Sequence, residues 1–129
     1  MINVVVATHG EMARGLQDSI RMVAGEFEGF HSIVFTEESG IDALRDQFKS
    51  VMTVIDKEHQ WLILCDIMGG SPFKVASEFS YQNEDVSVYY GVNLPLTIEI
   101  LLSREGKSLE EMKASLTDVL PIMVGLSPI

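Results

Sequence analysis

The chain has 129 residues, 47% of them hydrophobic, which excludes a disordered or fibrous protein and fits one domain with a buried core. Nine basic and nineteen acidic side chains give a formal net charge of −10, which argues against nucleic-acid binding because phosphate backbones favour clustered lysine and arginine. No apolar run approaches the ~18 residues of a membrane-spanning helix, and no signal-peptide pattern opens the chain, so we expect a soluble cytoplasmic protein.

Short apolar runs alternate with segments of helical periodicity from the amino terminus onward. Four runs predict strands, and they cover residues 2–7, 30–35, 61–65 and 86–90. After the first strand, apolar residues recur at helical spacing up to a stop signal at Gly25, and this stripe comprises Met12, Leu16, Ile20 and Val23. After the second strand lies the clearest helical stripe of the sequence, which comprises Ile41, Leu44, Phe48, Val51 and Ile55.

The third and fourth strands are each followed by a turn and a helix. The third strand leads through two glycines into a helix that we expect to begin with Ser71 as its cap and Pro72 as its first residue. After the fourth strand, residues 91–95 turn the chain into a largely buried helix over residues 96–103.

The carboxyl-terminal part of the chain predicts one more helix. Ser108 and Glu111 match a capping box and open it, and Pro121 ends it. Its apolar face comprises Leu109, Met112, Leu116 and Val119. We also consider a short final strand over residues 122–126.

The spacing of the strands indicates the fold class. Successive strands begin about 25 to 30 residues apart, which is the length of a βαβ crossover unit. They are apolar without alternation, as expected where helices cover both faces of a parallel sheet. We therefore predict an α/β fold of three layers, with a doubly wound, mainly parallel sheet in the strand order 2-1-3-4. Residues 1–129 are expected to form a single domain, because no linker or repeat interrupts them.

Polar residues follow the first and third strands at the point where each strand ends. His9 and Gly10 follow the first strand, and Asp66 follows the third. These strands are neighbours in the predicted order, and the winding reverses between them, where such sheets bind ligands. We therefore expect His9 and Asp66 to face each other. A carboxylate in this position fixes the imidazole tautomer and stabilises positive charge on the ring, which makes His9 a candidate nucleophile.

A candidate anion site follows Asp66. The turn Gly69–Ser71 runs into a helix start whose free N–H groups suit a phosphoryl group, and Ser71 either adds its hydroxyl or caps the helix. Nucleophilic imidazole, orienting carboxylate and anion site together suggest reversible phosphorylation of His9. The alternative is that His9 is a turn residue, that Asp66 caps a loop, and that the glycines mark only a turn.

The remaining reactive residue types are interpreted as structural. His31 falls within the second strand and His59 lies in a charged loop over residues 56–59, and neither has a candidate partner. Cys65 ends a buried strand and is expected to pack in the core. The chain contains no phosphate-binding P-loop, no complete dinucleotide fingerprint and no zinc-ligand spacing.

Three motifs together resemble the IIA domain of the mannose-type sugar phosphotransferase system, over essentially the whole chain. They are Ala7–Gly10 with Ala13 and Leu16, then Asp66 with Gly69–Phe73, then Gly91–Pro95. The resemblance implies a cytoplasmic phosphotransferase without a metal or other cofactor. It implies that the domain takes a phosphoryl group from phospho-HPr and passes it to a IIB domain beside a IIC/IID permease, without entering the membrane itself.

The resemblance also assigns roles to residues. His9 is the phosphoryl acceptor, Asp66 its hydrogen-bonded partner and Ser71 the serine on the phosphate side. The residues expected to bind the phosphoryl group are Thr8, Gly10, Gly69, Gly70 and Ser71. The family forms homodimers that exchange a closing strand, which fits a short antiparallel edge strand at residues 122–126. No linker to a fused IIB domain follows, so a stand-alone subunit is expected.

Two positions depart from the family pattern, and three other functions compete. Lys74 replaces a common asparagine and Met68 replaces a larger aromatic residue, and both bear on which IIB partner fits. The sugar stays open, because the IIB and permease subunits choose it. The alternatives are a receiver-like signalling domain phosphorylated on Asp66, a non-catalytic module that binds a small anion, and the related subunit of dihydroxyacetone kinases. Gly69–Phe73 favours the sugar-transport branch over the last of these.

Overall fold

The four apolar runs form one parallel sheet. In the computed structural model, which describes all 129 residues, the strands are β1 (Asn3–His9), β2 (Phe30–Phe35), β3 (Trp61–Cys65) and β4 (Val86–Tyr89). Their order in the sheet is β2-β1-β3-β4, and all three pairings are parallel. The predicted strand order is therefore confirmed, and the carboxyl ends of β1 and β3 lie next to each other.

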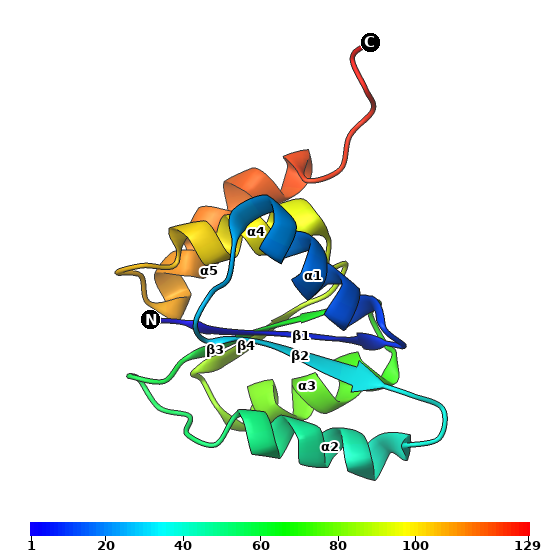
Figure 1. The fold of residues 1–129 in the computed structure, drawn as a ribbon. Coiled ribbons are helices and arrows are strands. Elements are labelled where there is room, and N and C mark those ends of the chain that lie inside the picture. Colours follow the sequence, from blue (N-terminus) through cyan, green and yellow to red (C-terminus); the bar gives the residue numbers. More distant parts are fainter.

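Helices cover both faces of the sheet and make three layers (Figure 1). One face carries α1 (Met12–Ala24), α4 (Leu94–Ser103) and α5 (Leu109–Val119), and the other carries α2 (Gly40–Val51) and α3 (Ser71–Gln82). A single 3-10 turn, Leu120–Ile122, follows α5. None of the helices combines the length and the apolarity that crossing a bilayer requires.

Each face of the sheet has its own core. Along β1, Val4 and Val6 belong to the cluster beneath α1, α4 and α5, whereas Val5 and Ala7 belong to the cluster beneath α2 and α3. Because successive side chains of a strand point to opposite faces, a strand buried on both sides must be apolar throughout. This requirement explains the uninterrupted apolar runs of the sequence.

One buried charge, that of Arg104, links the end of a helix to the backbone at the amino-terminal edge of the sheet. The residue is 4% exposed, and its guanidinium donates hydrogen bonds to the backbone carbonyls of Ile2 at 3.0 Å, Gly29 at 3.2 Å and Glu28. Burial lowers the pKa of Arg104, but the carbonyl oxygens satisfy its donors. The residue therefore fastens the end of α4 to the segments that lead into β1 and β2.

Two helical stripes differ from the prediction. Ala13 and Ile20 are the buried residues of α1, whereas Met12 and Val23 are exposed. The small side chain of Ala13 faces β1, and its N–H donates to the buried Thr8 hydroxyl at 2.8 Å, which sets the rotation of the helix. In the second helix, Leu44 and Phe48 are buried as predicted, but Ile41 is exposed and Ile55 lies beyond the last turn.

The end of the chain does not form the short strand considered for residues 122–126. Ile122 belongs to the 3-10 turn, and the following residues have no regular structure. In Figure 1 this segment runs away from the sheet and its helices, so no strand edge lies alongside it for pairing. Ile122, Val124 and Leu126 are exposed by 78%, 80% and 98%.

Candidate active site

His9 and Asp66 meet at the carboxyl edge of the sheet, as the strand order requires. The Nδ1 atom of His9, at the end of β1, lies 2.8 Å from Oδ2 of Asp66, the residue after β3. The backbone N–H of His9 donates to the same carboxylate oxygen at 2.9 Å. Because an ionised carboxylate can only accept, Nδ1 carries the proton and Nε2 presents its lone pair.

Hydrogen bonds hold Asp66 in place and keep it ionised. Its Oδ1 accepts from the N–H of Ile67 at 2.9 Å, and its backbone carbonyl accepts from the N–H of Gly91 at 2.9 Å. Partial burial acts to raise the pKa of Asp66, but the bonds from the backbone and ring of His9 and from Ile67 bring the pKa below its usual value. Both carboxylate oxygens are thus occupied, which favours an orienting role for Asp66 over that of a phosphoryl acceptor.

The imidazole of His9 lies between an aromatic ring and a glycine. The ring of Phe35, at the end of β2, meets it edge-on, with 5.7 Å between the ring centroids and 83° between the planes. On the other side, a Cβ placed on Gly70 would come within 2.7 Å of Cε1 and 3.4 Å of Nε2. The backbone at Gly70 therefore contacts the ring edge directly, and the absent side chain leaves the room that the ring occupies.

Open space adjoins His9 on the side of the β2–α2 loop. A cavity of about 310 Å³ is lined by His9, Gly10, Phe35, Thr36, Glu37 and Glu38. The His9 side chain is 44% exposed, and its Nε2 makes no hydrogen bond within the chain. The ring is therefore accessible from solution, and its Nε2 has no partner within the chain.

The start of α3 offers free N–H groups next to this ring. Gly70 is the N-cap, Ser71 the first helical residue and Pro72 the second, so the prediction that Ser71 caps the helix is wrong. The N–H groups of Ser71 and Phe73 have no acceptor within the chain, and Pro72 has no N–H. Since the cap is a glycine without a side-chain acceptor, this amino terminus keeps its affinity for an anion.

The other residues expected to bind a phosphoryl group have distinct positions. Thr8 is fully buried and its hydroxyl accepts from the N–H of Ala13, so its side chain supports the start of α1 and does not face the open space beside His9. Gly10 follows His9 with a φ of +58°, and Gly69 precedes Gly70 with a φ of +85°. Both values lie in the left-handed region that glycine adopts at low cost, so these residues form the tight turns on either side of the imidazole.

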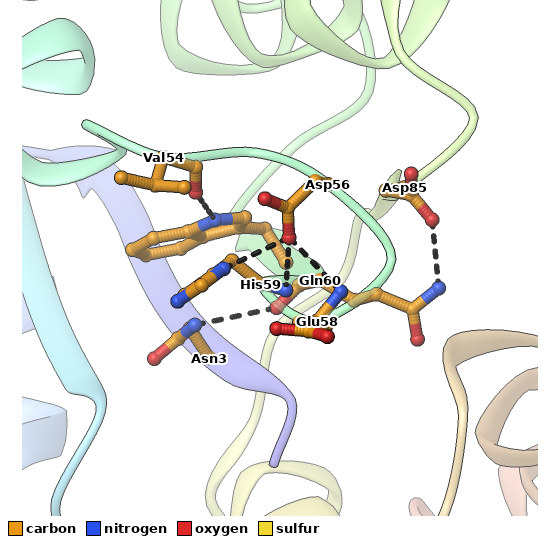
Figure 2. A network of polar contacts seen from close by, with 8 residues as sticks. Asn3, Val54, Asp56, Glu58, His59, Gln60 and Asp85 are labelled. Atoms are coloured by element: carbon orange, nitrogen blue, oxygen red, sulfur yellow. Dashed lines mark hydrogen bonds and ion pairs between the residues drawn. The ribbon is translucent and has the colours of Figure 1, made fainter.

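Cys65 and His31 lie within strands as predicted, whereas the prediction that His59 has no partner is wrong. Cys65 is fully buried, and burial together with the nearby Asp66 charge raises its pKa to about 12, so it stays a thiol. His31 packs against the Trp61 indole at 5.9 Å between centroids, and burial lowers its pKa. His59, however, does have a partner, because its Nδ1 lies 2.8 Å from Oδ1 of Asp56 (Figure 2).

The motif at residues 91–95 holds the end of β3, next to the site, through backbone hydrogen bonds. The N–H groups of Gly91 and Val92 donate to the carbonyls of Asp66 and Cys65 at 2.9 Å and 3.0 Å. The Asn93 side chain accepts from the N–H of Leu96 at 2.9 Å, so it caps α4 and starts that helix at Leu94. An asparagine before a Leu-Pro pair is the signal from which this earlier start could have been predicted.

The fold and the site place the chain among doubly wound α/β proteins that present a carboxylate-oriented histidine where the winding of the sheet reverses. A family model narrows this class. The model named EIIA-man, described as the PTS system fructose IIA component, matches residues 3–117. The chain therefore belongs to the mannose-type EIIA family of the sugar phosphotransferase system.

Individual relatives agree with this assignment. The fructose-specific EIIA component of Bacillus subtilis (strain 168) is 32% identical over 112 residues, which make up 87% of this chain and 77% of that protein. The mannose-specific EIIAB component of Escherichia coli (strain K12) is 32% identical over 88% of this chain, which spans only 35% of that longer protein. The crystal structure of EIIA from Streptococcus agalactiae superimposes with a TM-score of 0.86 at 26% identity, over 97% of both chains.

Proposed function

We propose that this chain is a phosphocarrier of a sugar phosphotransferase system, with His9 as the phosphoryl acceptor. The donor is phospho-HPr, and the recipient is a IIB domain that works beside a membrane permease. The 2.8 Å contact between Nδ1 of His9 and Oδ2 of Asp66 carries the proposal, because it leaves Nε2 as the one free nucleophilic nitrogen of an exposed ring. Membership of the EIIA-man family supports the choice of donor and recipient.

The transfer needs no proton movement at the attacking atom. The lone pair of Nε2 forms a bond to phosphorus while the N–P bond of the donor imidazole breaks and returns its electron pair to the donor nitrogen. The imidazole of His9 gains positive charge in this step, and the Asp66 carboxylate stabilises that charge through the proton on Nδ1. Transfer to the IIB domain reverses the step. Such loose transition states depend on placement and charge stabilisation, which rigid hydrogen bonds supply.

The start of α3 is assigned to the phosphoryl oxygens. A phosphoryl group on Nε2 extends from the ring edge that contacts Gly70, which brings its oxygens towards the first turn of α3. The free N–H groups of Ser71 and Phe73, together with the Ser71 hydroxyl, are the proposed donors. Gly10 and Gly69 contribute the left-handed turns that border the proposed phosphoryl site.

Replacement of His9 tests the proposal. His9→Ala is expected to abolish labelling by radioactive phospho-HPr, because the only proposed acceptor of this carrier is removed. The label on the unmodified chain should be lost in acid and survive base, as expected of phosphohistidine, whereas an acyl phosphate on Asp66 would be lost in base. Stoichiometric labelling of His9→Ala by the carrier would refute the assignment, and a base-labile label would favour the receiver-like alternative.

The substitution Asp66→Asn tests, in the same assay, whether the Asp66 carboxylate orients the His9 ring. Asparagine keeps the shape of the carboxylate but removes its charge, so labelling of His9 should slow by about 10-fold to 100-fold while circular dichroism stays unchanged. An unchanged rate would remove Asp66 from the mechanism. An unmodified chain that gains no covalent phosphate from the carrier, as measured by mass spectrometry, would instead support the module that binds a small anion.

We further propose that the chain acts as a homodimer held by its carboxyl-terminal segment. Ile122, Val124 and Leu126 alternate with the period of a strand and are all exposed, an arrangement that would be stabilised by pairing with a second copy of the chain. Val124→Asp should reduce the mass measured by light scattering from two chains to one. Tyr81→Asp, at a side chain 93% exposed on α3, is the matched control and should leave the dimer intact. A full-length chain that is a monomer at all concentrations would contradict this proposal.

A further inference from the structure

A second histidine–aspartate pair repeats the hydrogen bonding of the active site. The Nδ1 atom of His59 lies 2.8 Å from Oδ1 of Asp56, and the backbone N–H of His59 donates to the same oxygen at 2.9 Å. His9 and Asp66 make these two bonds at 2.8 Å and 2.9 Å, again to one carboxylate oxygen. Both imidazoles are therefore held in the tautomer that leaves Nε2 unprotonated.

The second pair is also accessible. The His59 side chain is 50% exposed, against 44% for His9, and its Nε2 makes no hydrogen bond. His31, the third histidine, is half-buried against Trp61 and has no carboxylate partner, so its ring is less exposed and is not oriented in this way. Of the three imidazoles, two thus combine an exposed Nε2 with a carboxylate on Nδ1.

Neighbouring residues fix the turn that carries this pair. Asp56 and His59 are joined by two backbone hydrogen bonds, and Oδ1 of Asp56 also accepts from the N–H of Glu58 at 2.9 Å (Figure 2). Next to the turn, Gln60 donates to Asp85 at 2.8 Å, and the indole N–H of Trp61 donates to the carbonyl of Val54 at 2.9 Å. The imidazole is thus held in advance by a closed turn at the start of β3, which is the condition for an oriented nucleophile.

The two pairs lie at opposite ends of the sheet. His9 ends β1, whereas the turn over residues 56–59 precedes β3 and lies near the amino terminus of β1. The seven residues of β1 span about 20 Å between these ends. The two histidines are therefore separate sites, and a substitution in one pair does not touch the other.

From this geometry we infer that His59 is a second site of phosphorylation, which accepts a phosphoryl group on Nε2 from small-molecule donors with an N–P bond and not from the protein carrier. The donor N–P bond breaks and returns its electron pair to the donor nitrogen, a bond from Nε2 to phosphorus forms, and the proton on Nδ1 stays shared with Asp56. Hydrogen bonding from His59 lowers the pKa of Asp56, so the carboxylate is ionised when the ring gains charge. The turn leads into a strand and not a helix, so His59 should react more slowly than His9.

Phosphoramidate, a small N–P donor, tests this inference without any carrier protein. The unmodified chain should gain two phosphoryl groups, at His9 and His59, and His9→Ala should gain one. Peptide mapping in base locates the groups, and ³¹P NMR should show attachment at Nε2 in both. Asp56→Asn should slow labelling of His59 by about 10-fold to 100-fold and leave His9 unchanged, and Asp66→Asn should do the reverse. His31 should remain unlabelled.

Three results would overturn the inference: no phosphoryl group on His59 in His9→Ala, labelling of His59 no faster than that of His31, or labelling of His59 that Asp56→Asn leaves unchanged. The side-chain oxygen of the introduced asparagine still accepts the backbone N–H groups, so the turn is expected to survive the Asp56→Asn substitution. The proposed carrier function can fail separately, because a chain that phospho-HPr does not label can still react with phosphoramidate at His59.

Discussion

Gly70→Ala should leave the protein folded and reduce phosphoryl transfer to His9 by about 100-fold. The added Cβ would lie 2.7 Å from Cε1 of His9, closer than two carbon atoms can approach, and 3.4 Å from Nε2. The imidazole must therefore move, which breaks its alignment with Asp66. Displacements of about 1 Å at a reacting group are sufficient for an effect of this size. The measurement is the rate of labelling by phospho-HPr in rapid-quench experiments.

The backbone conformation at Gly70 does not itself require glycine. The substitution therefore tests only whether the space beside the His9 ring is needed. Its φ is −74°, so alanine adopts this conformation without strain. Gly15→Ala is the matched control, because Gly15 lies in α1 with no atom within 4 Å of an added Cβ. That substitution should leave transfer unchanged and stabilise the chain by about 0.5–1 kcal/mol. Wild-type transfer in a folded Gly70→Ala variant would show that the glycine does not position the ring.

Arg104→Met should lower the free energy of unfolding by about 3 kcal/mol. The side chain is buried and donates to three backbone carbonyls, those of Ile2, Glu28 and Gly29, and methionine removes all of these bonds. The Gly29 carbonyl keeps the N–H of Val4 as a donor, so most of the loss is expected from Ile2 and Glu28. Arg104→Lys should give an intermediate loss, because one ammonium cannot reach all three oxygens in the geometry of the planar fork. Urea unfolding followed by circular dichroism measures both effects.

The control for this prediction is a surface arginine. Arg21 pairs with Asp18 at 2.9 Å on the exposed side of α1, so Arg21→Met should change stability by no more than about 0.5 kcal/mol. Equal losses for Arg104→Met and Arg21→Met would show that the buried hydrogen bonds contribute nothing beyond a surface ion pair. Labelling of His9 should persist in both variants below their unfolding midpoints, because Arg104 lies at the opposite edge of the sheet.

Much of the site was predictable because its residues follow strands whose order the sequence implies. Once the order 2-1-3-4 is assumed, the ends of the first and third strands must be adjacent, so His9 and Asp66 follow as a pair. His59 was misjudged although its partner Asp56 is only three residues away, because a turn closed by an aspartate and a histidine has no apolar pattern to mark it. The three-residue spacing of Asp56 and His59 in this charged loop was the signal from which the pair could have been predicted.

Other features had no signal that a single sequence could carry. In the sequence, Arg104 is only a charged residue after a predicted helix. Its partners are backbone carbonyls 75 to 102 positions away, and because every residue type has a carbonyl, the sequence does not mark them. The role of Gly70 depends on how closely α3 approaches the ring of His9. The rotation of α1 depends on a hydrogen bond from Ala13 to the buried Thr8.

The sequence by itself determined the number of strands, the fold class and the two polar residues at the strand ends, because apolar periodicity and polar strand ends are local properties. The order of the strands was assumed from that class, and the structure confirmed it. Only the tertiary structure decided which nitrogen of His9 is free, where its ring has room, and that a second imidazole is held in the same way. These features depend on distances between segments far apart in the chain, and such distances exist only after the layers have packed.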